Sequence, residues 1–330
     1  MAPLRCALRD SWLTVHRMHP AYSVIFFTTA SGAGYGLLAL VGLLAPAGLL
    51  PEGGWFTLTA LGLALALITG GLLSSTFHLT HPERAWRALS QWRSSWLSRE
   101  GVLALATFVP AVLFGLAVLF DAPRGLVAVL GLASAALALA TVWATSMIYA
   151  SLRAVRQWNS GWVPPAYLVL APMTGALLLA ALGHLWGGGW PGVGWIAAAL
   201  TVAGWLVKAA YWREIDTARP VHDLGAATGL NRFGAVHLLE KPHTEENFLM
   251  RELGFQVARA HAAKLRRIAH LTLFAVPLLL SVAALWLPPV LAGMAAVLAV
   301  LSAGVGVLTE RWLFFAEARH TAMLYYGEAA

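Results

Sequence analysis

The sequence predicts an all-α polytopic membrane protein, a bundle of eight transmembrane helices. Of its 330 residues, 59% are hydrophobic and only 11% are charged, whereas soluble domains carry about 25% charged residues. The apolar residues fall in eight stretches close to the ~20 residues that a helix needs to cross a bilayer. These observations exclude a soluble enzyme and an intrinsically disordered chain.

The eight spans follow one another with short or moderate connections, and the whole chain is predicted to be one integral membrane domain. The stretch through Pro20 carries charged residues and has no apolar core, so we expect no cleavable signal peptide and a first span that directs insertion. In chain order, the spans are placed at residues 21–45, 55–80, 101–120, 125–150, 164–186, 193–212, 268–287 and 290–316.

Basic residues are concentrated on one side of the predicted bundle. One set of connections, 46–54, 121–124, 187–192 and 288–289, holds a single Lys or Arg, Arg124. The other set, the N-terminal tail with 81–100, 151–163 and 213–267, holds eighteen. By the positive-inside rule, the second set and both chain ends lie in the cytoplasm. The net charge of +7 is therefore attributed to membrane orientation rather than to nucleic-acid binding.

The segment 213–267 is the one sizeable extramembrane region, and it is too small and polar for an enzyme domain. We interpret it as a docking surface for a partner. Within it, Thr244 is typical of a helix start, and Leu249, Leu253 and Val257 recur at helical spacing. An interfacial helix that packs only on its own bundle explains the same pattern equally well.

Three further features of the sequence lead to predictions: the glycines of the first span, a lysine within a span, and the single cysteine. Gly32, Gly34 and Gly36 in the first span are expected to permit close approach of a helix or a ligand. Lys208 lies one turn before Trp212, and we expect its ammonium group to reach the cytoplasmic interface by snorkelling. The single cysteine, Cys6, excludes an intramolecular disulfide and any paired-cysteine metal cluster. Metal-cluster chemistry is therefore assigned to partner chains.

Polar and titratable side chains gather at the predicted cytoplasmic ends of several spans. His78 lies ~35 Å along the second span, at the boundary of a ~30 Å hydrocarbon core, and Arg84 follows it. Glu100 lies where the chain re-enters the membrane, Tyr22 begins the first span and Tyr149 ends the fourth. Because polar groups at membrane depth are costly and mark function, these five residues form the candidate site.

A motif surrounds these residues and consists of His78-Leu79, Pro82, Arg84-Ala85, Leu97-Ser98 and Glu100. This motif resembles the signature of the dimethyl sulfoxide reductase anchor subunit family, and the resemblance covers most of the chain. The segment from Thr228 to Arg267 is similar to the membrane subunit of cytoplasmic, quinone-linked sulfite dehydrogenases. Orientation and the 213–267 segment depart from the dimethyl sulfoxide reductase branch.

The resemblance implies a subunit in the bacterial cytoplasmic (inner) membrane that anchors a molybdopterin catalytic subunit and an iron–sulfur subunit. It also implies electron exchange between the clusters and membrane quinone, no haem in this chain, and a quinol site at the positions of His78, Arg84 and Glu100. Because the basic face is cytoplasmic, we expect both hydrophilic partners on that side. Sulfite oxidation is the expected reaction of the complex, and a quinol-oxidising terminal reductase is the alternative.

Quinone chemistry accounts for the residue types. Two electrons and two protons must reach the quinone, with the protons added to carbonyl oxygens at the edge of an apolar slot. The expected quinone is ubiquinone or menaquinone. His78 is expected to donate a hydrogen bond and pass a proton. Glu100 is expected to orient His78 or relay protons, while Arg84 pairs with Glu100 or stabilises a developing anion. Tyr22 and Tyr149 complete the predicted quinone contacts.

Other interpretations remain open from the sequence. A bis-histidine haem between His16 or His19 and His78 or His81 is the competing cofactor. A secondary transporter is the competing function, since Pro110, Pro172 and the glycines of the first span could break helices; a structural anchor without quinone contact is another. Four more polar residues are interpreted as contacts to partners or between helices: His81, Glu310, Arg311 and His320.

Overall fold

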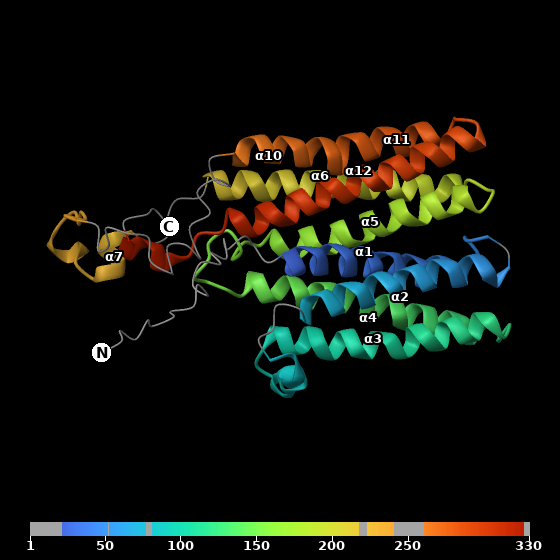
Figure 1. Ribbon diagram of the computed structural model, residues 1–330, viewed down its shortest axis with the longest axis horizontal. Helices are drawn as coiled ribbons and strands as arrows, with labels where there is room; N and C mark the ends of the chain where they lie inside the picture. Colours follow the sequence, from blue (N-terminus) through green and yellow to red (C-terminus); the bar gives the residue numbers. More distant parts are fainter. Residues whose placement is uncertain (1–21, 52, 77–80, 218–222, 241–260, 327–330) are drawn as a thin grey trace, which may run out of the picture.

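The computed structural model describes residues 22–51, 53–76, 81–217, 223–240 and 261–326. Within these ranges it confirms the all-α bundle, with eight helices long and apolar enough to cross a membrane (Figure 1). The seventh is a continuous helix made of α10 (Ala262–Ala269), the π-helical turns of η3 (His270–Ala275) and α11 (Val276–Ala284). The others are α1 (Tyr22–Leu44), α2 (Gly54–Thr76), α3 (Trp96–Leu119), α4 (Arg124–Ala150), α5 (Val163–Leu185), α6 (Pro191–Thr217) and α12 (Pro289–Ala316).

Three helices are longer than the apolar runs that predict them. α3 begins at Trp96 rather than at residue 101, α6 continues to Thr217 rather than to 212, and the seventh helix begins at Ala262 rather than at 268. The added turns carry charged side chains, which a count of apolar residues leaves out. Between α6 and α10, the described residues form α7 (Leu224–Thr228) and η2 (Asn231–Phe233); the helix expected from Thr244 lies outside the described residues.

The bundle has two unlike ends (Figure 1). The polar end carries η1 (Pro82–Gln91), the connection 151–162, α7 and η4 (Thr321–Tyr326). The Tyr325 hydroxyl donates to the Ala227 carbonyl over 2.7 Å and so joins η4 to α7. The hairpin end carries the short connections that follow α1, α3, α5 and α11. The basic connections that the structure describes belong to the polar end.

Helix α1 runs through the middle of the bundle, packed on α2, α4, α5 and α12. A Cβ atom at Gly36 would overlap the Ala171 carbonyl on α5, and one at Gly34 would overlap the backbone of α2 near Ala64. Gly32 is different, because no heavy atom lies within 4 Å of where its Cβ would be. Small residues thus let helices meet closely in the membrane, and Gly32 leaves open space.

Pro110 and Pro172 do not break their helices, which continue through them as α3 and α5. Transporters place their binding sites at interrupted helices near the midplane. The described helices therefore give the transporter interpretation no support from these prolines.

Candidate functional site

Glu100 is a buried carboxyl group on the second turn of α3, near the polar end. Its side chain is 5% exposed, and the Thr145 hydroxyl on α4 donates to Glu100 Oε1 over 2.5 Å. The segment η1 covers this turn, since the Ser98 hydroxyl donates to the Ala88 carbonyl. No cation pairs with Glu100 within the described ranges. Its one hydrogen-bonding partner there is a neutral hydroxyl.

The other two residues of the predicted trio are placed differently. Arg84 lies on η1 with an exposed side chain, and its guanidinium Nε is 3.8 Å from Glu83 Oε1. Among the described residues no ion pair joins Arg84 to Glu100, so the expected pairing of these two side chains is absent from this conformation. His78, with the haem candidates His16 and His19, lies outside the described residues.

The two candidate tyrosines have unlike environments. Tyr22 begins α1 and is 68% exposed. Tyr149 lies one turn after Thr145 on α4 and enters an aromatic cluster. Its ring stacks on Tyr167 of α5 at 6.1 Å between centroids, and it meets Trp158 and Phe314 edge-on at 5.3 Å. Tyr149 and Glu100 thus lie close to the same stretch of α4, whereas Tyr22 stays at the surface.

A second buried carboxyl group, Glu310 on α12, forms an ion cluster with two cations. Lys208 of α6 contacts Glu310 Oε1, and Arg311 Nε lies 2.5 Å from Glu310 Oε2. All three side chains are at most 3% exposed. The Lys208 ammonium lies 3.9 Å from the Tyr211 ring centroid. We call Lys208, Glu310 and Arg311 the inner ion cluster.

The inner ion cluster corrects one prediction and agrees with another. Lys208 does not snorkel to the interface, because a carboxylate on the facing helix and aromatic rings hold its ammonium group inside the bundle. Glu310 makes the interhelical contact that its structural interpretation expects. Sequence reasoning missed the pairing, although Lys208 with Asp216 and Glu310 with Glu317 repeat at helical spacing.

An outer ion cluster lies closer to the polar end. Arg266 of α10 is 2.7 Å from Asp216 Oδ2 on α6 and 2.9 Å from Glu317 Oε1, just after α12. Burial raises the pKa of Glu317 above its ordinary value, and Arg266 partly offsets this rise. Trp212 is 4% exposed, and its ring centroid lies 5.0 Å from the Lys208 ammonium and 5.8 Å from the Arg266 guanidinium. One indole ring therefore contacts a cation of each ion cluster.

The two remaining polar candidates, His81 and His320, contact other residues of this chain. His81 is exposed, with Nδ1 3.0 Å from Glu83 Oε1. His320 pairs with Val155 in an isolated β-bridge, and its Nδ1 accepts from the Ala322 amide over 3.1 Å. His320 thus contacts a segment distant in the chain, whereas the contact of His81 is local, and its interpretation as a partner contact stays a prediction. No group of three or more potential metal ligands occurs within the described part of the chain.

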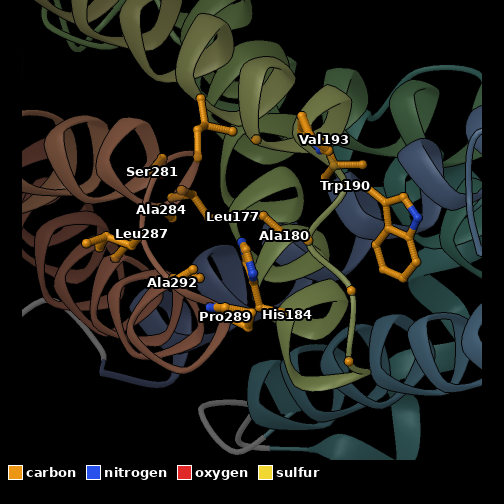
Figure 2. Close-up of a pocket in the computed structure, with 18 residues that line it drawn as sticks. Leu177, Ala180, His184, Trp190, Val193, Ser281, Ala284, Leu287, Pro289 and Ala292 are labelled. Atoms are coloured by element: carbon orange, nitrogen blue, oxygen red, sulfur yellow. The ribbon is translucent and has the colours of Figure 1, made fainter.

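A cavity of about 250 Å³ lies at the hairpin end, between α5, α6, α11 and α12. Figure 2 shows His184 between Ala180 and Ala292 in this cavity. A side chain at Gly189 would overlap the His184 ring, so the glycine-rich loop after α5 makes room for it. The cavity is a full helix length from Glu100, and no prediction covered it; a histidine before three glycines was the available signal.

Comparison with known proteins identifies the relatives of this bundle. Residues 16–317 match the family model described as the DMSO reductase anchor subunit (DmsC). The chain is also 34% identical to a sulfite dehydrogenase subunit from Allochromatium vinosum, over 95% of this chain and 100% of that protein. Since the family match spans nearly all of the eight-helix bundle, the chain belongs to the DMSO reductase anchor subunit family.

Proposed function

We propose that the chain is the quinone-reactive membrane subunit of a molybdopterin and iron–sulfur oxidoreductase. One observation carries this proposal. Glu100 is buried near the polar end, bound to the Thr145 hydroxyl, covered by η1 and close to Tyr149, which lies one turn after Thr145. A carboxyl group whose partner is a hydroxyl can take up and release a proton without breaking an ion pair.

The chemistry follows from this placement. Reduction of a quinone to quinol takes up two electrons and two protons, so a proton carrier must lie beside an apolar slot. Glu100 fits the role of carrier between the polar end and the bundle interior. Tyr149 supplies a ring surface, and His78, a few residues before η1 in the chain, remains the proposed hydrogen-bond donor. Arg84, exposed on η1, fits electrostatic attraction of a partner or of a developing anion better than direct pairing with Glu100.

Partners are proposed to dock on the polar end, at the cytoplasmic face of a bacterial inner membrane. The charge count of the connections supports this orientation. The segment between α6 and α10 supports docking, since α7 is tied to η4 by the Tyr325 hydroxyl. An iron–sulfur subunit docked at this end would lie on the same side of the bundle as Glu100 and Tyr149.

The relative named as a sulfite dehydrogenase subunit favours electron flow from sulfite to quinone. The alternative direction, from quinol to a terminal acceptor on the partner, uses the same residues in reverse. Sulfite-dependent quinone reduction by the purified complex separates the two, because a terminal reductase would not reduce quinone with sulfite.

The first test replaces Glu100 by glutamine in the complete complex. Because glutamine keeps the shape and loses the exchangeable proton, we expect E100Q to lower sulfite-to-decylubiquinone turnover at least about 100-fold. Oxidation of sulfite by a water-soluble dye, which bypasses the membrane subunit, should stay at the wild-type rate. The matched control is E83Q, since Glu83 is exposed on η1. Unchanged quinone turnover in E100Q would contradict the proposed role of this carboxyl group.

The second test concerns orientation. In a C6S background, cysteines at exposed Leu49, near the hairpin end, and at exposed Ser90, on η1, are treated with a membrane-impermeant maleimide. We expect L49C to react in spheroplasts and S90C to react only after lysis. The opposite pattern would place the polar end outside the cytoplasm.

A further inference from the structure

A narrow groove between α1, α4, α5 and α12 collects polar atoms that have no partner. Among the described residues, seven buried side-chain atoms lack a hydrogen-bond partner, and three of them lie here: Thr29 Oγ1, the Tyr167 hydroxyl and Arg311 Nη2. All three residues line this groove. The other two threonines of the lining are satisfied by their own helices, since Thr28 donates to the Val24 carbonyl and Thr174 to the Leu170 carbonyl. The unpartnered atoms thus form a small set with a common location.

Of the three residues with an unpartnered atom, Arg311 gives the clearest indication of a ligand. Its side chain is 3% exposed, Nε is held by Glu310 at 2.5 Å, and the guanidinium lies 4.1 Å from the Tyr167 ring centroid. A guanidinium group only donates hydrogen bonds, and leaving a buried charged donor unpaired is costly. The groove thus presents a fixed donor from Arg311 together with the hydroxyls of Tyr167 and Thr29. A ligand that fits must offer an acceptor.

The groove opens at Gly32. No heavy atom lies within 4 Å of a Cβ at this position, and Thr29, Gly32 and Ala33 are all partly exposed. This stretch of α1 belongs to a helix long and apolar enough to span the membrane, so the opening lies at the depth of the apolar phase. A ligand that reaches Arg311 this way must be soluble in the membrane.

The size and the position of the groove further restrict the class of ligand that it can bind. The groove has a volume of about 30 Å³, which admits a small group such as a carbonyl oxygen but not a ring. Thr29 lies ~10 Å along α1 from the polar end. Tyr167, at the groove, stacks on Tyr149 at 6.1 Å, and Tyr149 lies one turn after the Thr145 that binds Glu100. The groove therefore adjoins the residues proposed for quinone chemistry.

We propose that this groove binds the headgroup of the quinone, with one carbonyl oxygen accepting from Arg311 Nη2 and from the hydroxyls of Tyr167 and Thr29. The ring lies in the mouth beside Gly32, where a side chain is missing. Glu310 orients Arg311 through Nε and is a positioning residue. This inference rests on the proposed function and adds to it three binding residues and the side of the bundle from which quinone arrives.

The decisive variant is G32L, tested in the complete complex. Leucine fits the open space at Gly32 and closes the mouth of the groove. The matched control is G62L, because Gly62 on α2 also has no heavy atom within 4 Å of its Cβ position. We expect G32L to raise the KM for decylubiquinone at least about tenfold, while G62L stays within about twofold of the wild type. Dye-linked sulfite oxidation should be unchanged in both, and equal KM values in the two variants would overturn the proposal.

A second pair of variants addresses the floor of the groove without breaking the inner ion cluster. Y167F and T29V each remove one unpartnered hydroxyl, and we expect each to raise the quinone KM about three- to tenfold with little change in kcat. T174V is the control, since that hydroxyl is satisfied within α5. KM values for Y167F and T29V equal to that of T174V would count against the proposed contacts.

Direct labelling supplies a readout other than turnover. A photoreactive azido-quinone, irradiated with the wild-type complex, should attach to peptides containing Thr29 or Tyr167, and G32L should abolish this label. Label confined to other helices would overturn the groove as the binding site. If the wild-type complex neither reduces nor binds quinone, the proposed function itself fails; if it does both and G32L behaves as G62L, only the groove fails.

Discussion

Of the carboxyl groups buried near the polar end, Glu100 and Glu310 have opposite surroundings. Glu310 lies between Lys208 and Arg311, whereas the partner of Glu100 in the described structure is the Thr145 hydroxyl. Both are at most 5% exposed. The cost of taking a charge out of water is similar for the two, so the difference lies in how it is offset.

This contrast separates a structural carboxylate from one suited to chemistry. Loss of the negative charge at Glu310 would leave two cations opposed inside the bundle, which ties this charge to the fold. At Glu100 no such constraint exists, because a hydroxyl can hydrogen-bond with either form of the carboxyl group. An ion pair thus links α6 to α12. The carboxyl group between α3 and α4 is bound only to a hydroxyl in the described structure and can change its protonation state.

The largest effect is expected from breaking the inner ion cluster. E310Q removes the carboxylate that Lys208 and Arg311 share and leaves two buried cations without a counter-charge, and we expect a loss of about 3–5 kcal/mol of unfolding free energy. Thermal unfolding of the detergent-purified complex measures it. E83Q, at an exposed position on η1, is the control. The double variant K208M/E310Q leaves one buried cation instead of two and should recover part of the loss; no loss in E310Q would remove the structural role of the pair.

A smaller effect is expected where helices touch through glycine. G36A forces a methyl group against the Ala171 carbonyl, and overpacking of this kind costs about 1–3 kcal/mol. G32A meets nothing within 4 Å and should leave the unfolding temperature unchanged. Equal stability of the two variants would show that the α1–α5 contact is looser than described.

The smallest effect on stability is expected at Glu100 and Arg84, two of the residues proposed for quinone chemistry. E100Q retains a hydrogen-bond acceptor for Thr145 and should lose about 1 kcal/mol or less. R84A, at an exposed side chain, should stay within about 0.5 kcal/mol. The unfolding temperatures of both variants, measured beside E310Q, test the contrast between the two carboxyl groups. A loss in E100Q as large as that in E310Q would make Glu100 structural.

The sequence alone was sufficient for the class of fold, the number of spans and the family. Eight apolar runs and the charge asymmetry of the connections are one-dimensional signals, because the bilayer fixes both the length and the polarity of a spanning helix. The motif with Arg84 and Glu100 is likewise local. Helix ends were placed less accurately, since charged turns such as that of Arg99 belong to helices although they interrupt the apolar pattern.

The partners of the polar groups needed the tertiary structure. Lys208 and Glu310 are far apart in the chain. They meet because α5 and α11 each pack on both α6 and α12 and so bring the two side chains within reach of each other. The same holds for two glycines of α1 that look equivalent in the sequence. Gly32 lies beside open space, whereas Gly36 lies against α5. Membrane thickness dictates where helices begin and end; contacts between distant helices dictate which buried charge is neutralised and which remains available, because electrostatic free energy depends on distances that no linear spacing contains.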